Sequence, residues 1–227
     1  MGLPRPRPAP HAVRMLKQIP NALTLLRLIL APVIAWIFWL AVSSPLAADT
    51  LTAGSEAQAG YALTAAILFV LAALTDLFDG MAARAFDAHS KFGRIIDPIA
   101  DKALVGLPLI AIAIGVWSNG DPAWPIIAIA TAVIICRDVG MTLLRMFSSD
   151  GEGVRVSSLA KWKTALELFV VGALIVIIAI ITNWKSLGLG ESVSVPPALP
   201  VIWLALLVLA AALSAYTAFQ YLTTRKS

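Results

Sequence analysis

Four aspartates stand beside the apolar segments of this chain, within the stretch DLFDGMAARAFDAHSKFGRIIDPIAD at residues 76–101. An ionised carboxylate carried into a bilayer costs roughly 2.5 to 3.5 kcal/mol on insertion scales, so four of them would cost about 10 to 14 kcal/mol if nothing balanced their charge. The protein or its ligands must therefore supply compensating positive charge. The four residues are Asp76, Asp79, Asp97 and Asp101.

The spacing of these aspartates favours a metal site. On a helix, residues three and four positions apart share a face, and Asp76 and Asp79 are three apart, whereas Asp97 and Asp101 are four apart. Two antiparallel neighbouring helices joined by residues 81–94 would each offer a pair of carboxylates. Such acids repel one another unless cations lie among them, and all-oxygen ligation suits Mg²⁺, Mn²⁺ or Ca²⁺ over zinc. Two such metals could hold phosphate oxygens and activate a hydroxyl nucleophile.

Helix capping is the competing explanation for aspartates that precede prolines. Asp97 before Pro98 and Asp121 before Pro122 both fit an N-cap followed by proline at the first helical position. We expect capping for Asp121, whereas Asp97 fits either role. Asp87 lies in a short hydrophilic turn and is expected to be replaceable.

The elements that position these residues are predicted to be membrane-spanning helices. Of the 227 residues, 59% are hydrophobic and 13% charged, and the mean hydropathy of +0.87 lies outside the range of water-soluble domains. Apolar runs of about 20 residues cross a bilayer as helices, because lipid offers no partner to unpaired backbone groups. We therefore expect an all-α bundle of six transmembrane helices. The predicted spans are 22–43, 60–79, 98–117, 123–147, 164–182 and 199–222.

Lysine and arginine residues predict the orientation of the bundle, because short cytoplasmic loops carry the positive charge. These residues gather before the first span, after the second, around the link from the fourth to the fifth, and at the C-terminus. The alternate links contain only Lys185. Both termini and the four aspartates are thus expected on the cytoplasmic side of the cell membrane.

The start of the chain and its cysteine give simple predictions. The segment MGLPRPRPAPHAVRMLKQIP is basic but has no apolar core or small-residue cleavage site. We therefore expect residues 1–18 to be a retained flexible arm and residues 19–224 to form the transmembrane domain. One cysteine excludes an internal disulfide, and Cys136 is expected to be a buried, inert thiol.

The joint spacing around the aspartates resembles the signature of the CDP-alcohol phosphotransferase family. The pattern D-x2-D-G-x2-A-R-x8-G-x3-D-x3-D is met from Asp76 to Asp101 without a departure. The resemblance implies a six-helix membrane enzyme, usually a homodimer, that joins a CDP-linked donor to an acceptor alcohol and releases CMP. It implies two divalent cations, Mg²⁺ or Mn²⁺, bound by Asp76, Asp79, Asp97 and Asp101, with Asp101 also the general base. Contacts with the CDP donor are implied for Asn21, Thr24, Gly80, Ala83, Arg84 and Gly93.

Basic residues outside this motif bear on the acceptor. Arg27, inside the apolar stretch IPNALTLLRLI, needs either the acidic cluster or a phosphate as its partner. The stretches RDVGMTLLR and AKWKT place further cations near the inner ends of the fourth and fifth spans, where they could bind an acceptor phosphate or only set the topology. All three stretches resemble the branch of the family that transfers a phosphatidyl group from CDP-diacylglycerol to glycerol 3-phosphate. The residues expected at the acceptor phosphate are Arg137, Arg145, Lys161 and Lys163.

Two other functions stay open at this point. A cardiolipin synthase of the same family would use phosphatidylglycerol as the acceptor, and Ala160, where the glycerol 3-phosphate branch commonly has glycine, is a departure from that branch. Intramembrane carboxylates could also belong to a divalent-cation transporter, although these acids cluster at one membrane face. Apart from substrates, we expect membrane lipids and a second copy of the chain as partners, and no nucleic acid.

Overall fold

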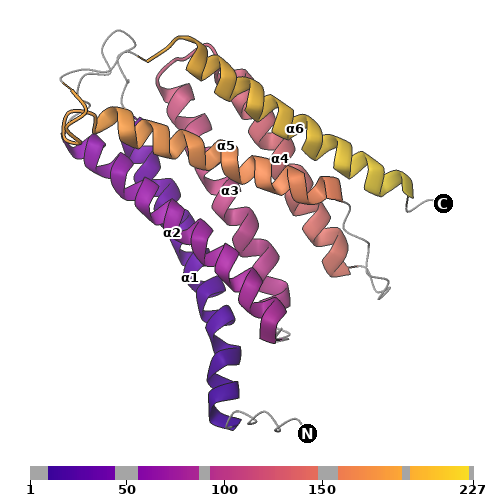
Figure 1. Cartoon of the computed structure of the whole chain (residues 1–227). Helices are drawn as coiled ribbons and strands as arrows, with labels where there is room; N and C mark the ends of the chain where they lie inside the picture. The colour runs from indigo at the N-terminus through magenta and orange to yellow at the C-terminus, as the bar shows by residue number, and fades with distance from the viewer. Residues whose placement is uncertain (1–9, 44–55, 87–92, 148–157, 191–194, 225–227) are drawn as a thin grey trace, which may run out of the picture.

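The computed structural model describes residues 10–43, 56–86, 93–147, 158–190 and 195–224. These residues contain six helices and, within the described ranges, no strand (Figure 1). Each helix includes a segment long and apolar enough to cross a membrane, which confirms the predicted all-α bundle of six spans. The helices are α1 Pro10–Val42, α2 Glu56–Phe86, α3 Gly93–Ser118, α4 Trp124–Phe147, α5 Ser158–Thr182 and α6 Ala198–Thr224.

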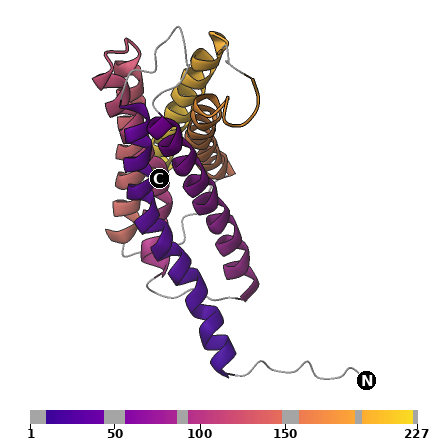
Figure 2. The same cartoon turned by 90° about the vertical axis from the view of Figure 1, so that its left-hand side faces the viewer.

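Helix α1 begins well before its membrane span, which runs over Ala22–Val42. Residues 10–18 of the predicted flexible arm are helical in the structure, and residues 1–9 lie outside the described part. The reason is local, because Pro10 suits the first helical position and the residues after it include good helix formers such as alanine, leucine, lysine and glutamine. Figures 1 and 2 both show the first turns of α1 extending beyond the other helices.

The helices pack in a pattern that gives α1 a central place near the acidic residues. Helix α1 packs against α2 and α3, α4 packs against α3 and α6, and α5 packs against α2 and α6. Among the described residues α2 and α3 also contact each other, although each packs more extensively against α1. The carboxylates of α2 and α3 meet through α1, because this helix contacts both.

Two glycines mark close approaches between helices. A Cβ added at Gly172 of α5 would lie 2.7 Å from Cε1 of Phe69 on α2, and one added at Gly115 of α3 would lie 2.7 Å from Cγ2 of Val42 on α1. Small residues let membrane helices approach in this way, where dispersion contacts take over from the hydrophobic effect. Absence of a side chain at these positions therefore contributes to how tightly the bundle packs.

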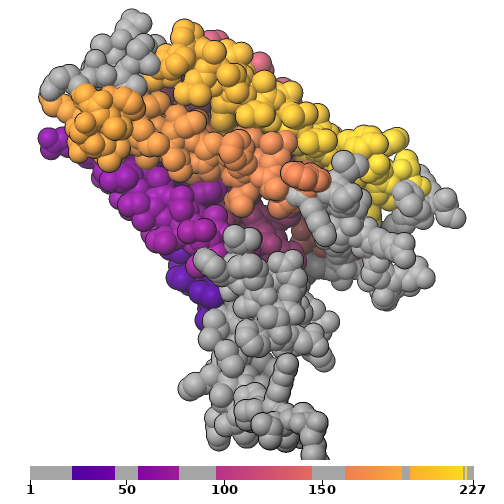
Figure 3. Space-filling model, in the orientation of Figure 1, coloured from indigo at the N-terminus to yellow at the C-terminus, as the bar shows by residue number. Residues whose placement is uncertain are grey.

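The outer surface of the spans is apolar. Figure 3 shows α5 lying between α2 and α6 on one face of the bundle, where Trp162 and Phe169 of α5 are 73% and 62% exposed. Side chains exposed on a membrane span contact lipid, which suits these residue types. Cys136 is also exposed, so the prediction of a buried thiol is wrong. Its position on α4 points away from the protein core, which a uniformly apolar span does not reveal.

The helix ends fall into two groups at opposite ends of the bundle. Figure 1 shows the starts of α1, α3 and α5 and the last turns of α2, α4 and α6 toward the bottom and right of the view, and the other helix ends at the upper left. The motif aspartates and the predicted acceptor residues therefore come from helix segments at the same end. Which membrane face this end occupies stays a prediction.

The turn between α3 and α4, at the other end, tests the capping prediction. Oδ1 of Asp121 accepts a hydrogen bond of 2.7 Å from the backbone N–H of Ala123, and Gly120 before it has a φ of 70°, which favours glycine. The side chain of Asn119 donates to the carbonyl of Val42 over 3.0 Å. Asp121 thus satisfies a backbone donor in the turn before α4, but the helix begins at Trp124 and not, as predicted, at Pro122.

Candidate active site

Arg27 joins two of the motif aspartates from different helices. Its side chain is 2% exposed, and Nη1 donates to Oδ1 of Asp76 on α2 and, over 2.6 Å, to Oδ1 of Asp101 on α3. The two carboxylates therefore lie beside each other, although they come from different helices. The sequence predicted either the acidic cluster or a phosphate as the partner of Arg27, and in the structure Arg27 binds the acidic cluster. This guanidinium supplies part of the positive charge that the aspartates require.

Asp97 also points to α1. Oγ1 of the buried Thr24 donates to Oδ1 of Asp97 over 2.5 Å. Because α3 begins at Gly93, Asp97 lies inside the helix and not at its N-cap position, and Pro98 is an interior residue. The capping alternative for Asp97 is therefore wrong. Thr24, predicted at the CDP donor, contacts the acidic cluster through Asp97 in this structure.

Several predicted residues occupy described helices while their side chains lie outside the described set, so their predicted roles stay predictions. They are Asn21 on α1, Asp79, Gly80, Ala83 and Arg84 on α2, Gly93 on α3, Arg145 on α4 and Lys161 on α5. Asp87 lies outside the described residues altogether.

The donor atoms of the acidic cluster suit a divalent cation. Asp76 and Asp101 keep 44% and 39% of their side-chain surface exposed although each contacts Arg27, so carboxylate oxygens stay accessible. Carboxylate oxygens are the ligands that Mg²⁺ and Mn²⁺ prefer. Among the described side chains, no group of three His, Cys, Asp or Glu residues is close enough to hold a metal ion, and Asp79 is not in that set. The carboxylate oxygens of the described acids therefore fit a divalent cation and would provide part of its ligands.

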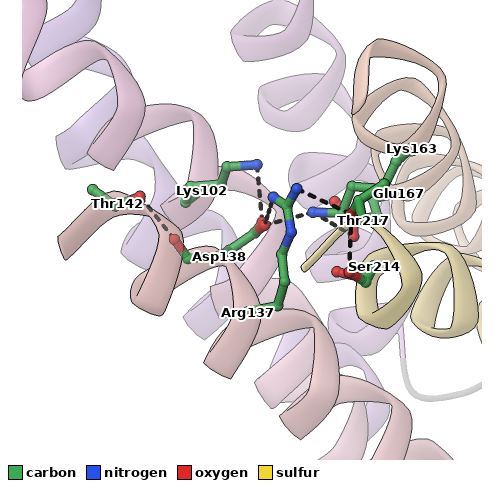
Figure 4. Close-up of polar contacts among 8 residues, drawn as sticks. All are labelled: Lys102, Arg137, Asp138, Thr142, Lys163, Glu167, Ser214 and Thr217. Atoms are coloured by element: carbon green, nitrogen blue, oxygen red, sulfur yellow. Dashed lines mark hydrogen bonds and ion pairs between the residues drawn. The ribbon is translucent and has the colours of Figure 1, made fainter. Parts of the chain in front are cut away.

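A second polar cluster surrounds Asp138 of α4 (Figure 4). Its Oδ1 accepts from Nζ of Lys163 over 2.5 Å and from Nη1 of Arg137 over 2.8 Å, and its Oδ2 lies 2.9 Å from Nζ of Lys102. Asp138 is 4% exposed and Lys163 is fully buried. One carboxylate therefore contacts cations from α3, α4 and α5. We call this group, with Glu167 and Thr217, the Asp138 cluster.

Glu167 and Thr217 complete the cluster from α5 and α6. Oε1 of Glu167 lies 2.9 Å from Nζ of Lys163, one helical turn away. Nη2 of Arg137 donates to Oγ1 of Thr217 over 3.1 Å. Nε of Arg137 is buried and has no hydrogen-bond partner in the described part of the protein. An unpaired buried donor costs free energy, so an anionic ligand at this position would stabilise the cluster.

The charges of the cluster do not balance. Its described members carry three cations, on Lys102, Arg137 and Lys163, and two carboxylates, on Asp138 and Glu167. Positive charge thus exceeds negative charge in a largely buried region. Such an excess favours binding of an anion such as a phosphate ester.

The sequence predicted Arg137 and Lys163 for one site, and the structure brings both to Asp138. It did not single out Lys102, Asp138, Glu167 or Thr217. Two signals were present, because Asp138 and Glu167 are carboxylates inside apolar spans and Glu167 stands four residues after Lys163. The contacts that bring the members of the cluster together depend on how α3, α4, α5 and α6 pack, which the spacing of residues along one helix does not reveal.

The fold and the two polar clusters together define a membrane protein with several spans. The charged residues of both clusters lie at one end of its helix bundle. The profile of the family described as CDP-alcohol phosphatidyltransferase matches residues 17–208, and the chain belongs to this family. It is accordingly a transferase of phospholipid synthesis. Enzymes of this family generally use divalent metal ions.

Curated relatives have the name CDP-diacylglycerol–glycerol-3-phosphate 3-phosphatidyltransferase. The protein from Cereibacter sphaeroides is 40% identical over 157 residues, a match that covers 69% of this chain and 62% of that protein. The protein from Bacillus subtilis is 37% identical over 158 residues, covering 69% of this chain and 76% of the relative. The protein from Escherichia coli is 28% identical over 218 residues, covering 92% of this chain and 95% of the relative.

Proposed function

We propose that this protein transfers a phosphatidyl group from CDP-diacylglycerol to glycerol 3-phosphate, giving phosphatidylglycerophosphate and CMP. The observation that carries the proposal is the convergence of Asp76 and Asp101 of the family motif on Arg27, at the same end of the bundle as the Asp138 cluster. The names of the relatives give this donor and this acceptor. They favour glycerol 3-phosphate over phosphatidylglycerol, and a transferase over a cation transporter.

The metal ligands in this proposal are the four motif aspartates, with two Mg²⁺ or Mn²⁺ ions as the cofactors. When bound, such ions supply positive charge to the pyrophosphate oxygens of the donor. Arg27 keeps Asp76 and Asp101 together, and Thr24 orients Asp97 through the hydrogen bond to its carboxylate. Hydrogen bonds of this kind tune the ligands of metal sites. The ligands are Asp76, Asp79, Asp97 and Asp101.

Donor and acceptor occupy opposite sides of these aspartates in the proposal. The CDP group lies near the small and basic residues of α2 and the start of α3, where absence of bulky side chains permits close approach. The acceptor phosphate is bound by cations of α4 and α5, to which the excess positive charge and the unpaired Nε of Arg137 lend support. The donor residues are Asn21, Thr24, Gly80, Ala83, Arg84 and Gly93, and the acceptor residues are Arg137, Arg145, Lys161 and Lys163.

Asp101 is the general base of the reaction. It takes the proton of the acceptor hydroxyl, and the acceptor oxygen forms a bond to the phosphorus that carries the diacylglycerol. The bond from that phosphorus to the oxygen bridging the two phosphates of the donor breaks, and CMP leaves with that oxygen. The partial exposure of Asp101 allows an acceptor to reach its carboxylate.

The setting of the reaction is also part of the proposal. The end of the bundle with the two clusters faces the cytoplasm, because most lysines and arginines outside the spans lie in the segments at this end. Lipid donors reach it from the membrane and glycerol 3-phosphate from water. The active form is a homodimer.

The experiment that tests the function supplies the purified protein with CDP-diacylglycerol, Mg²⁺ or Mn²⁺ and competing acceptors. We expect CMP release that requires the divalent ion and a lipid product identified by mass as phosphatidylglycerophosphate. A preference for phosphatidylglycerol as acceptor would overturn the choice of substrate. Divalent-ion uptake by proteoliposomes without CMP release would overturn the reaction class.

A further inference from the structure

We propose that Asp138 is a positioning residue that fixes the guanidinium of Arg137 for the acceptor phosphate and ties it to the helix that carries Asp101. The inference rests on the proposed function and deepens it. Asp138 is fully engaged by three cations and is almost fully buried, so its role is to orient those cations.

The contact between Arg137 and Asp138 is unusual for a helix. Neighbouring residues on a helix point in different directions and do not normally face each other. Here the guanidinium reaches its own neighbour, with Nη1 2.8 Å from Oδ1 of Asp138, while Nη2 donates to Thr217 on α6. A planar guanidinium bound at both terminal nitrogens has its plane fixed. The side chain is 90% buried, so this orientation does not depend on solvent.

Lys102 connects this arrangement to the acidic cluster. It directly follows Asp101 along α3, and its ammonium lies 2.9 Å from Oδ2 of Asp138. One carboxylate thus contacts both Arg137, at the proposed acceptor phosphate, and the residue beside the proposed base. Because reaction requires the acceptor hydroxyl to lie at Asp101 while its phosphate lies at the cations, this link sets the distance between the two ends of the acceptor.

Glu167 is a natural comparison for Asp138. It is 2% exposed, belongs to the same cluster and contacts Lys163, which Asp138 also contacts. No described contact joins it to Arg137 or Lys102. Neutralising either carboxylate raises the positive charge of the cluster by one unit, but only loss of the Asp138 carboxylate releases Arg137 and Lys102.

The test compares Asp138→Asn with Glu167→Gln in the full-length protein, in detergent with Mg²⁺. The measured values are kcat, the KM for glycerol 3-phosphate, the KM for CDP-diacylglycerol and the thermal unfolding midpoint. Loss of a charge-assisted hydrogen bond is expected to raise the KM for glycerol 3-phosphate in Asp138→Asn roughly ten- to a hundredfold, with the KM for the donor changed less than twofold. Glu167→Gln removes the same unit of negative charge but keeps Arg137 and Lys102 bound to Asp138, so it is expected to change the KM for glycerol 3-phosphate several-fold less than Asp138→Asn does.

A shift of this KM in the same direction and by a similar factor in both variants would overturn the positioning role, since charge alone would then explain it. Equal changes in the KM values of donor and acceptor in Asp138→Asn would also overturn it. If Asp138→Asn does not fold, Thr217→Val decides, because it removes the second point at which Arg137 is bound. We expect a roughly two- to tenfold higher KM for glycerol 3-phosphate there, and an unchanged value would contradict the inference. Absence of CMP release by the unmodified protein would instead refute the proposed function.

Discussion

Lys102 and Asp138 form an ion pair with Nζ and Oδ2 2.9 Å apart, although one lies on α3 and the other on α4. Because Lys102 follows Asp101 directly, this pair connects the acidic cluster around Arg27 with the Asp138 cluster. The two clusters are therefore parts of one connected polar region, and a change in one is expected to influence the other. Additivity of mutations across them should accordingly fail.

Asp101→Asn is expected to abolish turnover. The amide cannot accept the proton of the acceptor hydroxyl, and loss of general-base catalysis costs roughly a factor of 100 to 10,000. The protein should stay folded and bind CDP-diacylglycerol, as measured by the thermal midpoint and by donor binding. CMP release gives the rate.

Two conservative changes are controls for this variant. Asp121→Asn acts in the turn at the opposite end of the bundle, where the side chain binds a backbone N–H, and Asp87→Asn lies within the motif stretch but outside its fixed positions. Both are expected to keep near-normal activity. Near-normal activity of Asp101→Asn would contradict its assignment as the base.

Arg27→Met is expected to lower the thermal unfolding midpoint in the absence of divalent ions. The substitution leaves Asp76 and Asp101 without their shared cation, which is expected to lower the free energy of unfolding by about 1 to 3 kcal/mol. The loss is limited to this range because both acids are partly exposed and water screens their charges. Mg²⁺ should raise the midpoint more in this variant than in the unmodified protein, since a bound ion then supplies the missing charge. Arg27→Lys keeps a cation and should lose less. Equal midpoints for all three proteins would show that Arg27 does not balance the acids.

Thr24→Val is expected to weaken metal binding. The substitution keeps the size of the buried side chain but removes the hydroxyl that donates to Asp97 over 2.5 Å. Loss of a hydrogen bond that orients a metal ligand typically costs 10- to 100-fold in metal affinity, so the Mg²⁺ concentration for half-maximal activity should rise by roughly that factor. Thr24→Ser keeps the hydroxyl and should resemble the unmodified protein. Identical Mg²⁺ dependence of the two variants would rule out this role.

The spans could be predicted from the sequence because their causes are local. Length and apolar composition define a span, and the sequence positions of Asp76 and Asp101 put them near the ends of two such spans. The choice of Arg27 between an acid and a phosphate could not be predicted, because it depends on α1 packing against both α2 and α3. Asp138 was missed for the same reason, since its partners come from three helices.

The sequence also could not predict which side chains of a membrane span are exposed and which are buried in the bundle. Cys136 faces outward on α4, whereas Ile134, two residues earlier, is almost fully buried. In a soluble helix, polar residues would mark the outer face, but lipid favours the same apolar residues as the core does. The local pattern therefore did not distinguish lipid-facing from buried positions.

Gly172→Ala is expected to destabilise the bundle. The added Cβ would lie 2.7 Å from Cε1 of Phe69, closer than carbon atoms can pack. Phe69 is itself only 3% exposed and has little room, so relief requires its ring to turn into neighbouring side chains or α5 to move away from α2. Overpacking of this kind costs about 1 to 3 kcal/mol, which would lower the thermal unfolding midpoint.

Gly60→Ala on α2 is the matched control, because a Cβ there meets nothing within 4 Å. Alanine also has the higher helix propensity, so this variant should be as stable as the unmodified protein or slightly more stable. If close packing between α2 and α5 limits stability, the two alanine variants must change the midpoint in different ways. Equal midpoints would mean that Phe69 adapts to the added methyl group, and that Gly172 is not required for the approach of these helices.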